Sequence, residues 1–472
     1  MTTTNRQAPA PVLLPGFAGT ELPAWLEARL RDGLGGVCLF AENIAGPEQL
    51  RALTATIRRA NPRALIAIDE EGGDVTRLHA ATGSPYPGNA VLGRLDDLEL
   101  TAAVGAAVAA ELRSAGVDLN FAPDVDINSN PDNPVIGVRS FGAEPALVAR
   151  HTAAWIAAHE AQGVAVSAKH FPGHGDTSAD SHHALPIVDL PLEALREREL
   201  VPFRAAIAAG ARTVMSSHIL LPQLDADEPA TFSARILGEL LRDELGFTGV
   251  VVSDALDMAG ASGEIGIPAA AVRALAGGCD LLCIGTRTTE AQLTAIEEAV
   301  REALGGGALA PERLADAVAR VDALATSLAE QPAAPAPAPY VSDPVRIASA
   351  FDVREGVEPP AAARILVLET TANAAVGEIP WGPASVGMAV HRVGEGDPVP
   401  SVAGPYLVVG KDNHRHGWTR AYIDATRAAH PGTVVVDMGW PGPDRDYADI
   451  ATFGASRGVA EALRLLLDGG GS

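Results

Sequence analysis

Short apolar runs recur through the first two thirds of the chain, and longer stretches with apolar residues at helical spacing separate them. The runs are rich in Val, Ile and Leu and have the length of buried strands. Between them, stretches such as residues 47–60 and 145–163 repeat apolar residues every three or four positions, which predicts helices. The predicted strands are residues 12–17, 35–40, 64–71, 118–127, 164–171, 213–219, 249–258 and 280–286.

This alternation indicates the fold class. Apolar strands that alternate with helices form a parallel sheet covered on both faces. Eight strand–helix units in succession favour an α/β fold of the (β/α)₈ TIM barrel type. A doubly wound open sheet is the alternative, but it ordinarily needs fewer strands.

A second domain is expected after an Ala/Pro-rich linker. Residues 329–344, AEQPAAPAPAPYVSDP, favour an extended spacer without a core of its own. The linker separates a barrel domain, residues 1–328, from a smaller α/β layered domain, residues 345–472. In the latter we expect strands at 364–370, 405–411 and 432–439 and helices at 420–429 and 457–468.

Polar residues follow the apolar part of five predicted barrel strands, as in IAIDEE, NFAPDVD, SAKHF, MSSHI and VVSDALD. In a barrel of this type the carboxyl ends of the strands carry the active site. The pattern therefore predicts an enzyme with polar side chains gathered at one mouth. These side chains are Asp69, Asp124, Asp126, Lys169, His170, His218 and Asp254.

Composition and charge narrow the function. Hydrophobic residues make up 47% and charged residues 20% of the 472 residues, which is typical of a globular protein with a large core. The net charge of −24, from 59 acidic against 35 basic residues, repels phosphate backbones, so we expect no nucleic-acid partner.

The cysteines and the lack of long apolar runs indicate the cellular compartment of the protein. Cys38, Cys279 and Cys283 form no C-x-x-C pair and suggest no disulfide framework. The sequence shows no apolar stretch typical of a signal peptide or a membrane span. We therefore expect a cytoplasmic protein with no membrane association.

The densest group of titratable residues lies in residues 169–186, KHFPGHGDTSADSHHALP. His170, His174 and Asp176 form H-x-x-x-H-x-D, which is similar to clustered metal ligands, although no regular helix fixes them on one face. A structural interpretation, as turn caps or solvent-exposed groups, suits other histidines of the chain. These are His79, His151, His159, His183 and His391.

Proton transfer is the third interpretation of this loop. Asp180 and His182 are separated by one residue, so their side chains lie on the same side of an extended segment. A carboxylate beside an imidazole fixes its tautomer and raises its basicity. The preceding residues GDTSAD are polar and contain Gly, as expected of a loop that swings over a bound substrate.

The motifs KHFPGHGDTSADSH and VVSDALDM resemble glycoside hydrolase family 3, specifically its two-domain β-N-acetylglucosaminidase branch. The segments AIDEEGGDVTRL, NFAPDVDINSNPDNPVIGVRSFG, MSSHI and PATFS agree, so the resemblance covers residues 10–330. The D-S-H segment is the specific part, since other members of the family use a Glu of the second domain as acid/base.

The resemblance implies a role for individual residues. Asp254 matches the catalytic nucleophile of a retaining glycosidase, His182 the acid/base and Asp180 its orienting partner. Asp257, three residues after Asp254, is expected to be structural. The positions that match contacts to the sugar or lie close to it are Asp69, Arg139, Lys169, His170, Arg77 and His218. No metal and no cofactor are implied.

The implied activity is exo-cleavage of terminal β-linked N-acetylglucosamine from muropeptide or chitin fragments. A histidine that is neutral at rest leaves the site with one fewer negative charge than a second carboxylate, so inorganic phosphate is an alternative acceptor. A β-N-acetylglucosaminide or β-glucoside phosphorylase, a metal-dependent hydrolase and a non-catalytic sugar-binding protein remain as alternatives. Asp74 stands where the family often has Arg, which puts that position's part in sugar binding in doubt.

Overall fold

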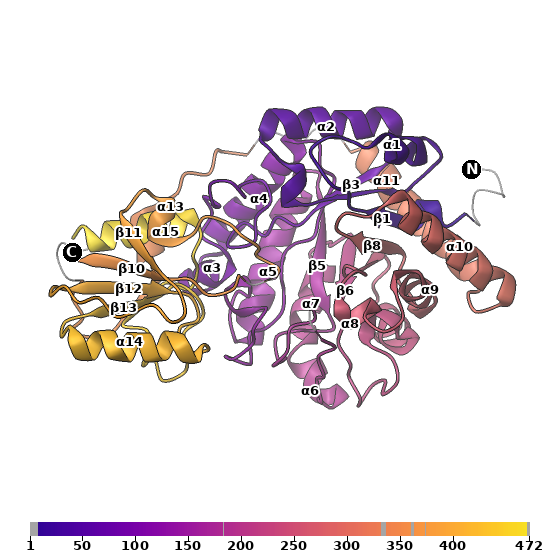
Figure 1. The fold of residues 1–472 in the computed structure, drawn as a ribbon. Coiled ribbons are helices and arrows are strands. Elements are labelled where there is room, and N and C mark those ends of the chain that lie inside the picture. Colours follow the sequence, from indigo (N-terminus) through magenta and orange to yellow (C-terminus); the bar gives the residue numbers. More distant parts are fainter. Residues whose placement is uncertain (1–7, 183, 332–336, 360–362, 373, 470–472) are drawn as a thin grey trace. The chain divides into compact units, whose positions relative to one another are not determined.

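The computed structural model describes residues 8–182, 184–331, 337–359, 363–372 and 374–469 (Figure 1). His183 and the middle of the Ala/Pro linker, residues 332–336, lie outside these ranges. The described residues form two compact units. One comprises residues 8–70, 98–127 and 148–339, and the other comprises residues 71–97, 128–147 and 340–469.

The first unit contains an eight-stranded parallel sheet in the order β1-β8-β7-β6-β5-β4-β3-β2. Strands β1 and β2 also adjoin, which closes the sheet and confirms the (β/α)₈ barrel. All eight strands fall within the segments predicted from the hydrophobic pattern. They are β1 (Leu13–Pro15), β2 (Gly36–Leu39), β3 (Leu65–Ile68), β4 (Leu119–Asn120), β5 (Ala165–Phe171), β6 (Thr213–Ser216), β7 (Val250–Ser253) and β8 (Leu281–Gly285).

Helices alternate with these strands along the chain. Helix α10 begins with a capping box, in which the Thr289 hydroxyl accepts the Gln292 N–H and the Gln292 side chain accepts the Thr289 N–H. The helices of the unit are α1 (Ala24–Arg31), α2 (Pro47–Ala60), α4 (Leu98–Ser114), α5 (Pro145–Glu160), α6 (Leu192–Glu197), α7 (Leu200–Ala208), η6 (Arg235–Glu244), α8 (Ala259–Ser262), α9 (Ile267–Gly277), α10 (Glu290–Gly306) and α11 (Pro311–Ala329).

The second unit is a three-layer α/β domain, also as predicted. Its sheet has the order β11-β10-β12-β13-β14-β9, with only β9 antiparallel. Because neighbouring strand residues point to opposite faces, Val367, Val409 and Val436 pack against helices α12 and α15. Leu368, Val408 and Val435 pack against α14 on the other face.

The three predicted strands of this domain are β10 (Arg364–Leu368), β12 (Tyr406–Gly410) and β13 (Val434–Asp437), and the two predicted helices are α14 (Gly417–Ala429) and α15 (Arg457–Leu467). The hydrophobic pattern missed several shorter elements. They are α12 (Pro344–Ala348), α13 (Gly382–Ser385), β9 (Asp352–Val353), β11 (Val390–Val393) and β14 (Ile450–Ala451), and the unit also contains α3 (Asn89–Leu95). Most residues of β9 and β11 are partly or fully exposed, so these two strands form no apolar run.

Candidate active site

The carboxyl ends of β3, β4 and β5 bring the first predicted residues together. Lys169, in β5, is only 2% exposed, and its Nζ lies 2.5 Å from Oδ1 of Asp69, the residue after β3. Asp124, beyond the end of β4, pairs with Lys169 through an isolated parallel bridge. A buried ammonium needs a partner of opposite charge, so the Asp69 carboxylate fixes the Lys169 side chain at the mouth of the barrel.

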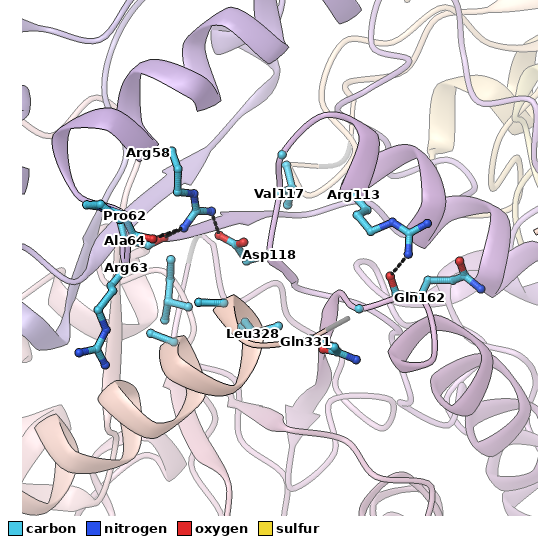
Figure 2. A pocket seen from close by; sticks show the side chains of 15 residues that line it. Arg58, Pro62, Arg63, Ala64, Arg113, Val117, Asp118, Gln162, Leu328 and Gln331 are labelled. Carbon is cyan, nitrogen blue, oxygen red and sulfur yellow. Dashed lines mark hydrogen bonds and ion pairs between the residues drawn. The ribbon is translucent and has the colours of Figure 1, made fainter. Parts of the chain in front are cut away.

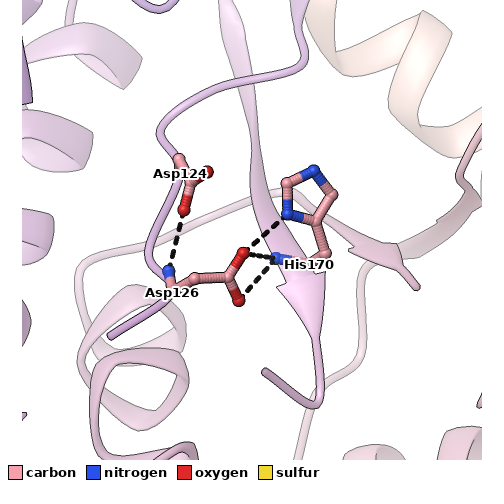
Figure 3. A group of neighbouring side chains, drawn as sticks. All are labelled: Asp124, Asp126 and His170. Atoms are coloured by element: carbon pink, nitrogen blue, oxygen red, sulfur yellow. Dashed lines mark hydrogen bonds and ion pairs between the residues drawn. The ribbon is translucent and has the colours of Figure 1, made fainter. Parts of the chain in front are cut away.

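Asp126 organises the next layer of the site (Figure 3). Its carboxylate accepts a hydrogen bond from His170 Nδ1 at 2.7 Å and others from the backbone N–H groups of His170 and His174. Burial alone would raise the pKa of Asp126, but His170 and His174 together lower it below the usual value. The bond fixes the His170 ring so that Nε2 points away from Asp126.

The structure also tests the metal hypothesis. Asp124, Asp126 and His170 bring one potential ligand atom each within 4.8 Å of one another. However, Nδ1 of His170 donates its proton to Asp126, whereas a metal ligand must be deprotonated. The three ligands suggested by the sequence, His170, His174 and Asp176, have separate partners. Asp176 pairs with Arg198 at 2.6 Å, and the ring nitrogens of His174 contact two hydroxyl groups. These donors and acceptors fit a hydrogen-bond network better than a metal centre.

The predicted dyad is present in the loop after β5. Nδ1 of His182 lies 2.6 Å from Oδ1 of Asp180, and that oxygen also accepts the His182 backbone N–H at 2.9 Å. The His182 side chain is 27% exposed and that of Asp180 is 13% exposed. The carboxylate therefore orients the imidazole with Nδ1 toward Asp180.

Asp254 follows β7, and its carboxylate accepts the Ala255 N–H at 2.7 Å. Burial would raise its pKa, but the nearby His218, His170 and His182 rings together lower it below the usual value. His218, which follows β6, donates from Nε2 to the Ala255 carbonyl at 3.0 Å and so braces the Asp254 turn. Asp257 instead accepts hydrogen bonds from the backbone and hydroxyl of Thr286.

Two predicted sugar ligands and the divergent Asp74 lie in the second unit. Arg139 forms a buried bidentate pair with Glu71, with 2.7 Å between Nη2 and Oε1 and 3.0 Å between Nε and Oε2. Arg77 donates to the carbonyls of Ala375 and Val376. Asp74 accepts the Ala455 N–H at 2.8 Å, so a carboxylate at this position anchors the backbone of the second unit.

Sequence reasoning left His174 and Ser181 without a task, and it included Asp126 only among the polar strand-end residues. Both His174 and Ser181 are 2% exposed. The available signal was weak, since a buried loop histidine and an exposed one look alike in sequence. Two other histidines were misjudged in detail, because His151 and His159 are structural but fully buried on α5 rather than exposed to solvent.

A separate hollow of about 380 Å³ lies at the opposite, amino end of strands β3, β4 and β5 (Figure 2). Its arginines serve the scaffold. Arg58 bonds the Ala64 carbonyl and Asp118, and Arg113 donates to the Gln162 carbonyl. Basic groups at helix ends commonly satisfy such carbonyls, and this end of a TIM barrel usually serves stability.

The fold and the site define a TIM-barrel enzyme with carboxylates and histidines at its strand ends. A family model described as the glycosyl hydrolase family 3 N-terminal domain matches residues 22–324. The chain belongs to glycoside hydrolase family 3.

The chain is similar to several known members of this family. Beta-hexosaminidase A of Pseudoalteromonas piscicida is 37% identical over 343 residues, which are 67% of this chain and 57% of that protein. A beta-hexosaminidase of Stenotrophomonas maltophilia strain R551-3 is 42% identical over 284 residues, 58% of this chain and 83% of that protein. The solved structure of a family 3 beta-N-acetylglucosaminidase from Paenibacillus sp. FPU-7 is 31% identical, with a TM-score of 0.87 over 100% of this chain and 97% of that one.

Among the described residues, every helix is too short or too polar to cross a lipid bilayer.

Proposed function

We propose that the protein is a retaining exo-β-N-acetylglucosaminidase. The observation that carries the proposal is the 2.6 Å contact between His182 and Asp180, in the same unit as a half-buried Asp254 on which the His182 ring acts electrostatically. The similarity to beta-hexosaminidases and to a family 3 beta-N-acetylglucosaminidase supports the same activity.

In the first step, the Asp254 carboxylate attacks the anomeric carbon and the bond to the leaving oxygen breaks. A lowered pKa keeps Asp254 ionised, as a nucleophile requires. The His182 ring, protonated on both nitrogens at this step, gives its Nε2 proton to the leaving oxygen, while its Nδ1–H stays bonded to Asp180, which orients the ring. A covalent glycosyl-enzyme on Asp254 results.

In the second step, His182 acts as a base toward water, which attacks the anomeric carbon and releases Asp254. Two displacements at the same carbon retain its β configuration. We propose that Asp69, Lys169 and His170 bond the sugar hydroxyls, since charged partners give short, strong hydrogen bonds. From the resemblance, Arg139 and Arg77 are further proposed contacts, and His218 supports Asp254.

Phosphorolysis is the second candidate. The specific observation is that the proposed acid/base is an imidazole, which adds no negative charge that would repel a phosphate dianion. The experiment measures turnover of an aryl N-acetylglucosaminide and an aryl glucoside, each with and without phosphate. Free N-acetylglucosamine as the main product supports the hydrolase, whereas dominant N-acetylglucosamine 1-phosphate contradicts it.

The remaining details are also proposals. Muropeptide or chitin fragments as substrates fit a site for terminal N-acetylglucosamine. If muropeptides are the substrates, the enzyme would act in peptidoglycan recycling. A cytoplasmic location is supported by the three free, buried cysteines.

We propose that no metal takes part in the reaction, so turnover should survive chelation. Inactivation by a chelator would favour a metal-dependent hydrolase. Binding of the sugar without turnover would favour a non-catalytic sugar-binding protein.

A further inference from the structure

The loop that carries the proposed dyad is tied down at one residue, Ser181, which lies between Asp180 and His182. The Ser181 hydroxyl is 3.0 Å from Nε2 of His174. The Ser181 carbonyl accepts the N–H of Gly260 in α8 at 3.1 Å. Ser181 is held through both its side chain and its backbone. This restricts the positions of its neighbours in the chain, Asp180 and His182.

His174 is the other end of this tie. Its Nδ1 contacts the Thr177 hydroxyl at 2.8 Å, and its backbone N–H donates to Asp126 at 2.7 Å. Burial lowers the pKa of His174 to about 4, so the ring remains neutral near pH 7. A neutral ring has one donor and one acceptor nitrogen, and each can be matched by a hydroxyl group.

The tie leads back to the sugar-binding end of the strands. Asp126 accepts hydrogen bonds from both His174 and His170. One carboxylate therefore holds His170, which is proposed to bind the sugar, and His174, at the start of the loop that carries the dyad. The far side of the loop is fitted as closely. A Cβ on Gly260 would come within 3.0 Å of the Ser181 carbonyl oxygen and 3.2 Å of His218 Cβ.

We propose that His174 is a positioning residue which, through its hydrogen bond to Ser181, holds the Asp180–His182 dyad where it can protonate the leaving oxygen. The inference rests on the proposed function, because it assumes that His182 is the acid/base. It gives a task to a buried histidine that no step of the proposed reaction uses.

The test compares two substrates with different leaving groups. A leaving group that departs unaided needs no proton, whereas a poor one depends on the acid. Ser181→Ala should therefore lower kcat/KM by about 10- to 100-fold on a poorly leaving aryl or disaccharide N-acetylglucosaminide. On an activated dinitrophenyl substrate the loss should stay within about threefold, because the nucleophile is untouched. His182→Ala should show the same selectivity to a greater degree.

Matched variants at the other end sharpen the test. His174→Gln keeps a polar atom near the position of Nε2 and can still reach Ser181, whereas His174→Asn keeps one near Nδ1 and reaches only Thr177. We expect His174→Gln to keep the wild-type ratio of kcat/KM between the poorly leaving and the activated substrate better than His174→Asn. The Asn variant should resemble Ser181→Ala. Thr177→Val removes the contact to His174 Nδ1 and the hydrogen bond from the Thr177 hydroxyl to the His174 carbonyl, but it leaves the contact between His174 and Ser181 intact. It should therefore cost less than Ser181→Ala.

Hydrogen–deuterium exchange over peptides covering residues 174–182 gives a readout that needs no turnover. Faster exchange in Ser181→Ala with an unchanged Tm supports the tie. Equal losses on both substrates, or unchanged exchange and unchanged selectivity, overturn the proposal. If the wild type cleaves neither substrate, or His182→Ala leaves the selectivity unchanged, the proposed function fails, and exchange alone then decides whether His174 and Ser181 hold the loop.

Discussion

Oδ1 of Asp180 receives both the ring Nδ1–H and the backbone N–H of His182, at 2.6 and 2.9 Å. One carboxylate oxygen thus sets the backbone turn and the ring orientation of a residue two positions later. Such a compact arrangement needs no partner from another strand, because both residues of the dyad lie in one loop.

Asp180→Asn tests the dyad directly. An amide oxygen can still accept the two N–H groups, but it lacks the charge that stabilises a protonated ring. We expect kcat on an unactivated N-acetylglucosaminide to fall by on the order of 10²- to 10⁴-fold, with the fold unchanged by circular dichroism. Activity within threefold of the wild type would remove Asp180 from the mechanism.

Asp254→Asn should abolish the covalent step. The loss expected is at least about 10³-fold in kcat, because an amide does not form the glycosyl ester. Asp257→Asn is the matched control, since Asp257 contacts Thr286 and should affect turnover far less. Mass spectrometry after reaction with a 2-fluoro sugar should find the label on Asp254, and a label elsewhere would refute the assignment.

Asp69→Asn should destabilise the barrel mouth and weaken substrate binding. The change leaves the Lys169 ammonium, 2% exposed, without its ion-pair partner Asp69, which should lower the free energy of unfolding by about 2–3 kcal/mol. KM should rise as well. Arg63→Met, which removes an exposed ion pair to Asp322, should cost less than about 1 kcal/mol. Similar losses in the two variants on urea unfolding would contradict this account.

Glu199 should make stability depend on pH. Burial raises the pKa of its carboxyl from 4.5 to about 7, with Arg198 opposing the rise. The folded protein therefore holds a proton that the unfolded chain releases between these values, and stability falls by up to about 3 kcal/mol as pH rises from below 4.5 to above 7.

Glu199→Gln removes this titration and so should flatten the stability profile across that interval. Its stability should exceed that of the wild type most clearly at pH 7.5 and least at pH 4.5, as measured by urea unfolding. Glu193→Gln, at an exposed site, serves as the control. Parallel profiles for wild type and Glu199→Gln would show that Glu199 does not titrate in this range.

The hydrophobic pattern determined the barrel because each strand is buried on both faces and therefore apolar along its whole length. That rule predicted all eight barrel strands and strands β10, β12 and β13 of the second sheet. It also predicted which residues meet, since parallel strands end at one edge. The Asp69–Lys169 pair and the proximity of His218 to Asp254 follow from that geometry.

Local spacing similarly predicted the Asp180–His182 contact, because two residues one position apart need no tertiary information to face each other. The sequence could not show which histidine of the loop is buried. His174 is enclosed because Asp126, Thr177 and Ser181 surround it, and Asp126 lies 48 residues before it in the chain.

The hydrophobic pattern could not place the segments between strands either, because their contacts are with residues distant in the chain. Residues 71–97 and 128–147 follow barrel strands in sequence, yet they form a compact unit with residues 340–469. The Arg139–Glu71 pair and the Asp74–Ala455 bond within that unit join residues far apart in the chain. Sequence alone thus determined the elements and the side chains at their ends, because periodicity and strand direction are local. Only the tertiary structure decided which polar groups are buried together, because burial depends on residues distant in the chain.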